Sequence, residues 1–184
     1  MVELQLLSAR QSHTLFDPLV DIYQAVFSQP PYHETMPDFF NFAGRLSFHA
    51  HRPGFRCVVA LPAPGELPVG FAYGFPGQAG TWFYDLVAPR LPADLKDQYL
   101  GDYFEFAELA VLPAWQGQGL GGRLHDTLLS GLSQRSACLA TADLETNARH
   151  LYHNRGWVTL LERITLPDIE LKFAILGKNL SSHP

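Results

Sequence analysis

Four glycines fall within six positions in the segment 117–122, between an apolar stretch and the expected start of a helix. Because glycine has no Cβ atom, the backbone N–H groups of such a segment can turn toward one point. The first N–H groups of a helix have no intrahelical acceptors, and the helix dipole makes this end partly positive. The segment therefore predicts a phosphate-binding loop, with a plain tight turn as the alternative.

The glycines alone leave the kind of phosphate ligand open. Gly117, Gly119 and Gly122 also satisfy the dinucleotide pattern G-x-G-x-x-G, and Asp143 follows where a ribose-binding acid would stand. That pattern normally follows its strand directly, whereas residues 113–116 intervene here. The chain after Asp143 is also short for the rest of a dinucleotide fold. An NAD-binding oxidoreductase is thus the less favoured interpretation.

Glu105 and Glu108 are the two charged residues of an otherwise apolar run over 104–112. Side chains alternate along a strand, so these two carboxylates are expected on opposite faces rather than as a pair. A carboxyl group in apolar surroundings has a raised pKa, which suits a general base. Glu108 is the first candidate for this role, and a carboxylate satisfied by neighbouring N–H groups is the structural alternative.

Alternating helical and strand patterns surround these candidates. The sequence predicts strands over 2–7, 55–61, 69–74, 104–112, 137–142, 157–166 and 169–176, and helices over 15–27, 38–50, 92–99, 120–132 and 147–155. Such alternation is typical of an α/β fold with a mixed sheet. With 184 residues, the chain 1–184 is expected to form a single domain. The least regular segment, 76–103, is expected to be a lid or insert.

The net charge, the lack of secretion and membrane signals in the sequence, and the cysteine positions argue against several kinds of partner. Thirteen Lys and Arg against eighteen Asp and Glu give a net charge of −5, which argues against a nucleic-acid partner. The sequence shows neither a signal-peptide pattern nor an apolar stretch long enough to span a membrane, so a cytoplasmic protein with no membrane partner is expected. Cys57 and Cys138 lie in apolar runs without metal-ligand spacing, which predicts buried free thiols and no metal.

Two segments of the chain match two known sequence motifs, which occur here in their usual order. Gln116, Gly119 and Gly121 match [Q/R]-x-x-G-x-[G/A], and residues 148–157 match A-x-x-L-Y-x-x-x-G-[F/W]. Together they resemble the GCN5-related N-acetyltransferases, the GNAT family, over about residues 104–157. The resemblance implies a mixed, largely antiparallel sheet flanked by helices. It also implies that a splayed parallel pair of strands, 104–112 and 137–142, holds acetyl-CoA as the cosubstrate.

The same resemblance implies an enzyme that transfers an acetyl group directly, in a ternary complex, to a primary amine of a small molecule or peptide. Tyr152 matches the family's general acid, with a half-buried aromatic ring packed on the sheet as the structural alternative. Glu108 aligns with a common position beside the acetyl-binding residues. Glu145 stands where many relatives carry Asn, and Asn147 either takes over that cofactor contact or only starts the following helix. The implied cofactor-binding residues are Leu109, Ala110, Val111, Gln116, Gly117, Gln118, Gly119, Leu120, Gly121, Gly122 and Asn147.

The acceptor end is the least determined by sequence. By the same resemblance it is lined by the first two helices, by the loop between them with the segment 31–34, and by loops beside the central strand, which points to the segment 76–103. Candidate acceptor-binding residues are Tyr32, His33, Trp82 and Glu105. The negative net charge is compatible with a cationic amine. A catalytically inactive acyl-CoA-binding sensor is the main alternative function, and the chain is expected to be a monomer or homodimer.

Overall fold

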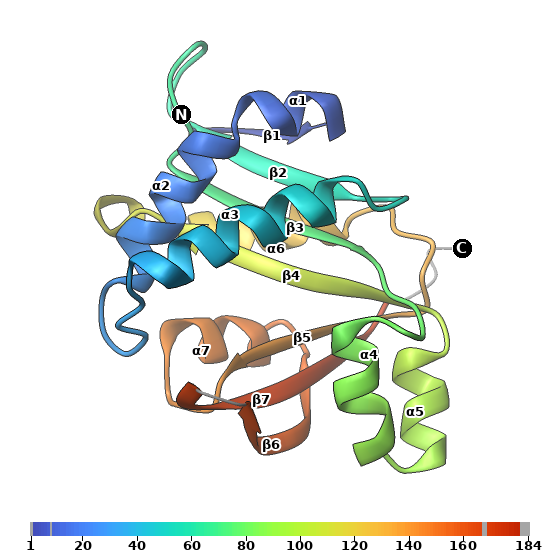
Figure 1. Ribbon diagram of the computed structural model, residues 1–184. Coiled ribbons are helices and arrows are strands. Elements are labelled where there is room, and N and C mark those ends of the chain that lie inside the picture. The colour runs from blue at the N-terminus through green and yellow to red at the C-terminus, as the bar shows by residue number, and fades with distance from the viewer. Residues whose placement is uncertain (1, 8, 167–168, 181–184) are drawn as a thin grey trace. The chain divides into compact units, whose positions relative to one another are not determined.

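The computed structural model describes residues 2–7, 9–166 and 169–180 (Figure 1). The strands are β1 (Glu3–Leu7), β2 (Arg56–Leu61), β3 (Gly70–Pro76), β4 (Tyr103–Val111), β5 (Ser136–Ala142), β6 (Val158–Leu166) and β7 (Ile169–Asn179). The α-helices are α1 (Ala9–Thr14), α2 (Phe16–Phe27), α3 (Met36–Ala50), α4 (Trp82–Val87), α5 (Ala93–Leu100), α6 (Leu120–Leu129) and α7 (Asn147–His153). Two short 3-10 helices are η1 (Ala88–Arg90) and η2 (Pro113–Trp115).

The seven strands follow the hydrogen-bonded order β1-β2-β3-β4-β5-β7-β6. The pairs β1–β2, β2–β3, β5–β7 and β6–β7 are antiparallel. The pair β4–β5 is parallel, with Tyr103 opposite Ser136 and Glu105 opposite Cys138. This arrangement confirms the predicted α/β class, the largely antiparallel mixed sheet and the parallel pair.

The chain forms two compact units, Met1–Phe75 with Ala107–Ser130, and Pro76–Phe106 with Gly131–Pro184. In the first unit, α2 and α3 pack on one face of β1–β3 (Figure 1). Alternate strand residues such as Val59 and Phe71 join that core. On the other face, Gly70 lets Leu124 of α6 approach, since a Cβ atom there would stand 3.2 Å from the leucine Cδ1.

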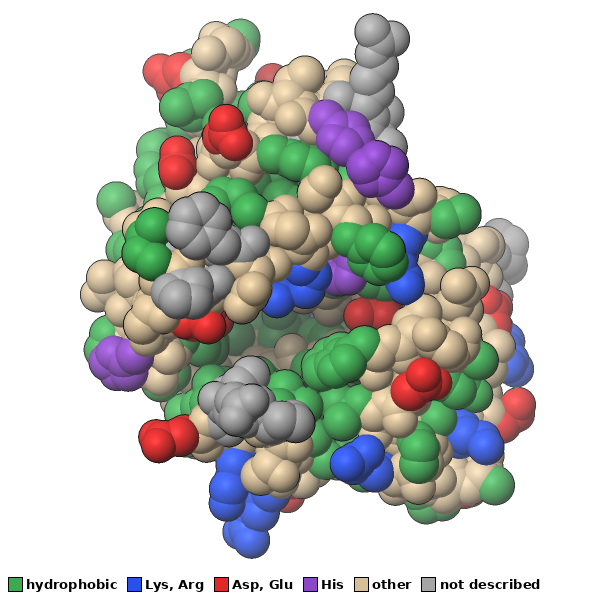
Figure 2. Space-filling model, in the orientation of Figure 1, with side chains coloured by type: hydrophobic (Ala, Val, Ile, Leu, Met, Phe, Trp, Pro, Cys, Tyr) green, Lys and Arg blue, Asp and Glu red, His purple; other side chains and the backbone are tan. Residues whose placement is uncertain are grey.

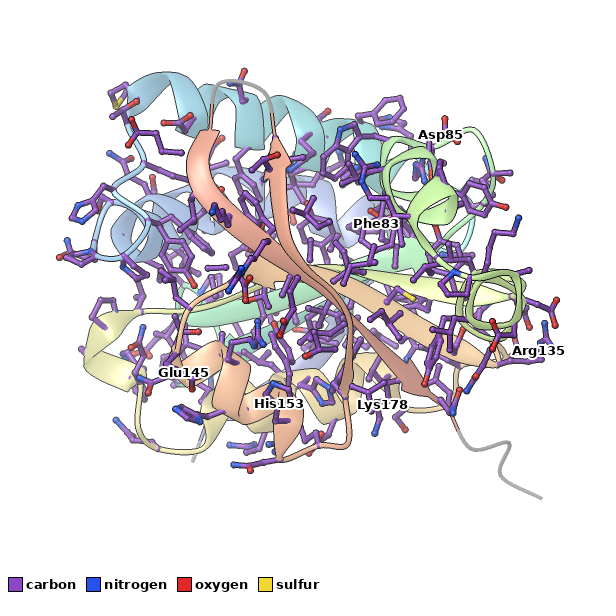
Figure 3. The ribbon with its side chains drawn as sticks, turned by 90° about the horizontal axis from the view of Figure 1, so that it is seen from below. Phe83, Asp85, Arg135, Glu145, His153 and Lys178 are labelled. Carbon is purple, nitrogen blue, oxygen red and sulfur yellow. The ribbon has the colours of Figure 1, made fainter. Side chains whose placement is uncertain are left out.

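In the second unit, the segment 76–103 is more regular than the sequence indicates. It contains α4 and α5, which lie side by side (Figure 1) and share a core with β5 and β7. Phe83 belongs to this core, whereas Asp85 on the same helix is exposed (Figure 3). A helix of six residues offers too few repeats for periodicity to reveal it, which is why the sequence predicts a helix over 92–99 and misses α4. The roles of this segment as a lid and of the chain as one domain stay predictions.

The end of α6 differs from the sequence-based prediction for a local reason. The helix predicted over 120–132 ends at Leu129, because Ser130 is extended and Gly131 has a positive φ of 69°. Cys57 and Cys138 are buried thiols that take part in no disulfide, as predicted. In the described part of the chain, no helix combines the length and apolarity needed to cross a membrane. Acidic and basic side chains are interspersed on the face drawn in Figure 2.

A largely buried ion pair fixes the start of α7 in the second unit. The Arg149 guanidinium lies 3.0 Å from Asp143 Oδ1, with 9% and 17% of the two side chains exposed. The other Asp143 oxygen accepts a hydrogen bond from the Arg163 N–H of β6 at 2.8 Å. The Thr146 hydroxyl accepts from the Arg149 N–H at 3.1 Å and caps α7. Asp143 therefore joins α7 to β6.

Replacing Asp143 with Ala should destabilise the protein by about 3 kcal/mol, because the buried Arg149 charge would lose its close partner. Glu162 would remain 3.9 Å from Arg149 but is 61% exposed, so it compensates little. Urea unfolding measures the change. The matched control is Glu145→Ala, whose carboxylate is 84% exposed, with an expected change within about 0.5 kcal/mol. Equal effects of the two substitutions would contradict the anchoring role.

Candidate active site

The glycine loop after β4 has the backbone geometry that the sequence predicts. Gly117 and Gly119 have φ angles of 73° and 75°, in the left-handed region that favours glycine. A Cβ atom at either position would meet nothing within 4 Å, so the space beside the loop is open. Residues 116–119 are all exposed. The loop can therefore accept a ligand against its backbone.

The loop is also held at both ends. At its start, the Gln116 side-chain amide donates to the Val111 carbonyl at 2.8 Å, which ties the loop to the end of β4. At its end, Gly119 occupies the N-cap of α6 without a side chain to cap the helix. The first N–H groups of α6, from Leu120 onward, therefore have no intrahelical acceptor and are available to an anion. Leu120 and Gly122 are buried, which fixes the helix start against the core.

Glu108 lies in β4 within a cluster of polar side chains in the first unit. Its side chain is 14% exposed, and the carboxylate stands 3.7 Å from the Arg45 guanidinium of α3. Burial raises the pKa of Glu108 to about 7, although the nearby Arg45 charge works in the opposite direction. Glu34 adds to the rise. A carboxyl group that changes protonation near pH 7 has the property required of a general base.

Tyr152 lies in the second unit among aromatic rings. Its side chain is 6% exposed and makes edge contacts with Phe106 at 6.0 Å and Trp157 at 5.7 Å between ring centroids. The helix ends just beyond it, where Gly156 has a φ of 77°. The sequence pattern A-x-x-L-Y-x-x-x-G-W thus corresponds to a short helix, a left-handed glycine and a buried tryptophan. Asn147 is the first residue of α7 and is exposed.

The four candidate acceptor residues are divided between the two units. In the first, Tyr32 packs edge-on against Phe27, and burial together with the charges of Glu108 and Glu34 raises the pKa of its hydroxyl. His33 is exposed, with a φ of 53°. In the second unit, Trp82 of α4 is 63% exposed and Glu105 of β4 is 9% exposed. Tyr32 is thus the candidate that the structure places in the electrostatic surroundings of Glu108.

The sequence did not reveal the side chains that surround Glu108. The Tyr23 hydroxyl donates to Glu34 at 2.9 Å, and Arg45 approaches Glu108 from α3. Tyr73 of β3 also interacts with Arg45 and Glu108. Glu34 belongs to the segment 31–34, which the resemblance does assign to the acceptor end. Arg45 lies on the second predicted helix, which the resemblance also assigns to the acceptor end, but the helical pattern shows it only as a polar residue beside the buried Phe42 and Leu46.

Asp143 does not support a dinucleotide site. Both of its carboxylate oxygens have partners within the second unit, Arg149 Nη1 at 3.0 Å and the Arg163 N–H at 2.8 Å. A ribose-binding acid must instead offer an oxygen to its ligand. Among the residues that the structure describes, no group of three or more His, Cys, Asp or Glu side chains could hold a metal ion.

Known proteins resemble this chain in sequence and fold. Residues 55–159 match the family described as the acetyltransferase (GNAT) domain. The GCN5-like protein acetyltransferase Rv2170 of Mycobacterium tuberculosis is 33% identical over 138 residues, which cover 67% of this chain and 66% of that protein. This chain thus spans just under two thirds of the length of that relative.

Two solved structures share the fold at low sequence identity. A phosphinothricin acetyltransferase from Sinorhizobium meliloti, in complex with acetyl-CoA, has a TM-score of 0.66 at 19% identity and covers 97% of this chain and 88% of its own. The ribosomal-protein-S18-alanine N-acetyltransferase from Escherichia coli has a TM-score of 0.63 at 16% identity and covers 100% and 97%. These likenesses agree with the match over residues 55–159, and the chain belongs to the GNAT acetyltransferase family.

Proposed function

We propose that this protein is an acetyl-CoA-dependent N-acetyltransferase that moves an acetyl group directly to a primary amine in a ternary complex. The observation that supports it most is the loop 116–122, with two left-handed glycines and an uncapped helix start. The acceptor is a small molecule or peptide. Tyr32, His33, Trp82 and Glu105 are the proposed acceptor-binding residues, and the protein is proposed to act as a monomer or homodimer.

The loop and the end of β4 fit the coenzyme. Open space beside Gly117 and Gly119 leaves room for a diphosphate, and the first N–H groups of α6 can donate to it. We assign this role to Gln116, Gly117, Gln118, Gly119, Leu120, Gly121 and Gly122, with Leu109, Ala110 and Val111 on the strand and Asn147 as a further contact. Acetyl-CoA supplies the acetyl group and a thiolate leaving group.

Glu108 is the proposed general base. An amine with a pKa near 10.4 is mostly protonated at neutral pH, so its proton must be removed before it can attack. Because the pKa of Glu108 is raised to about 7, its carboxylate is a stronger base than an ordinary one and, where the pH is at or above that value, can accept that proton, directly or through water. Activity should therefore fall as the pH drops through about 7.

Tyr152 is the proposed general acid, which donates its phenolic proton to the departing sulfur. Its ring is confined by Phe106 and Trp157, so the hydroxyl has a defined direction. Fixed positioning of this kind lowers the entropy lost on reaching the transition state. An inactive acyl-CoA sensor would have no need of an acid or a base, so the presence of both candidates favours the enzyme.

Acetyl-CoA should stabilise the protein against heat and NAD should not. At a concentration of 100 times its Kd, a ligand adds about 2.7 kcal/mol to stability. Gly119→Asp should abolish this stabilisation, because the new carboxylate would repel the diphosphate. Gly65→Asp is the matched control, since Gly65 also has a positive φ (82°) and open space beside it. Stabilisation by NAD, or full stabilisation of Gly119→Asp by acetyl-CoA, would refute the loop assignment.

Tyr152→Phe should lower kcat by about 100-fold with little change in acetyl-CoA affinity, because it removes only the proton donor. The measurement is release of the CoA thiol over a panel of primary amines. Tyr84→Phe on α4 is the matched loss of a phenolic hydroxyl and should leave kcat unchanged. If the wild-type protein binds acetyl-CoA yet no amine elicits thiol release, the sensor function replaces the enzyme. Unchanged turnover of Tyr152→Phe would remove the acid role.

A further inference from the structure

Arg45 is the centre of a polar cluster inside the first unit. It extends from α3 with 44% of its side chain exposed, and its Nη2 lies 3.7 Å from Glu108 Oε2. The hydroxyls of Tyr23 on α2 and Tyr73 on β3 also interact electrostatically with its guanidinium. Tyr23 in turn donates to Glu34 at 2.9 Å. A chain of electrostatic interactions thus runs from Glu34 through Tyr23 and Arg45 to Glu108.

Most of the titratable groups in this cluster are neutral at physiological pH. Burial raises the pKa of the Tyr23, Tyr32 and Tyr73 hydroxyls above their ordinary value. His49 Nδ1 lies 3.3 Å from the Tyr73 hydroxyl, and burial with the charges of Arg45 and Arg52 lowers the pKa of that imidazole to about 4. The charges that act on Glu108 from its unit are therefore those of Arg45 and Glu34.

Glu34 acts on the pKa of Glu108 in the opposite direction to Arg45 and more weakly. Its Oε1 accepts from Tyr23, while its Oε2 is buried without a hydrogen-bond partner among the described residues. Burial raises the pKa of Glu34, and the charge of Asp38 adds to the rise. When Glu34 is ionised, its negative charge makes ionisation of Glu108 harder, whereas the positive charge of Arg45 makes it easier.

We propose that Arg45 is a positioning residue which holds the Glu108 carboxylate in its ionised form, and that Glu34 opposes it, so that the two residues set the pH at which the site becomes active. The inference rests on the proposed function in one respect, the role of Glu108 as base. The Arg45 Cζ lies 5.4 Å from the centroid of the Phe42 ring, so the guanidinium has a packing partner beside Glu108. With 44% of its side chain exposed, Arg45 also keeps contact with water, so the pair avoids the full desolvation cost of a buried ion pair.

The test compares substitutions that remove charges of opposite sign. Arg45→Met should raise the pKa of Glu108 by about 1 unit, the lower end of the range for a neighbouring opposite charge, because Arg45 is partly exposed. Glu34→Gln should lower that pKa by about half a unit. Arg45→Lys keeps the charge and should restore most of the wild-type behaviour. Arg52→Met is the matched control, which removes a positive charge that contacts Phe75 instead, and should cause no shift.

Two measurements are made on each variant. Carbon-13 NMR titration of the Glu108 carboxyl, assigned with Glu108→Gln, reads its pKa without any substrate. The pH dependence of kcat/KM then shows whether the acidic limb moves by the same amount. Opposite shifts in Arg45→Met and Glu34→Gln, in both measurements, support the inference.

Two outcomes separate the inference from the proposed function. If the pKa of Glu108 measured by NMR shifts by less than about 0.3 unit in Arg45→Met, or shifts by as much in Arg52→Met as in Arg45→Met, the inference is overturned. Suppose that the pKa of Glu108 shifts as expected, while the acidic limb of the kcat/KM profile stays in place or is still present in Glu108→Gln. Then Glu108 is not the base. In that case the claim that Arg45 and Glu34 set the pH of activity is also overturned, and only the electrostatic pairing stands.

Discussion

An ionised carboxylate in an apolar sheet is the constraint around which the first unit is arranged. Moving such a charge out of water is costly unless an opposite charge or hydrogen bonds compensate for it. Glu108 faces this cost, and α3 compensates in part by placing Arg45 3.7 Å away. Because the compensation is incomplete, the carboxyl retains a pKa raised to about 7. The same burial that costs stability makes the group suitable for proton transfer near neutral pH.

The cluster around Glu108 depends on ordinary packing. Phe42 stacks on Tyr23 at 3.7 Å between ring centroids, with an interplanar angle of 6°, and both residues belong to the core of α2, α3 and the strands. This stacking directs the Tyr23 hydroxyl toward Glu34. The polar contacts are thus placed by a hydrophobic core, which resists small displacements because it is close-packed.

The loop after β4 is arranged by a different principle, in which backbone groups rather than side chains face the ligand. Positive φ at Gly117 and Gly119 orients the backbone, and the Gln116 amide ties the loop to the Val111 carbonyl. In the second unit, Asp143 and Trp157 fix the two ends of α7 and thereby the direction of Tyr152. Each proposed functional group is therefore held by contacts within its own unit.

The family, the fold class and the glycine loop could be predicted from the amino-acid sequence, because these depend on local patterns. Hydrophobic periodicity identifies most strands and helices, and the glycines report backbone angles that other residues rarely adopt. Periodicity does not detect the short helix α4 or the early end of α6, since their signals span too few residues. Only the tertiary structure brought Arg45, Tyr23, Glu34 and Glu108 together. These residues lie on separate elements, and electrostatic interactions depend on distance in space, which the spacing along the chain does not encode.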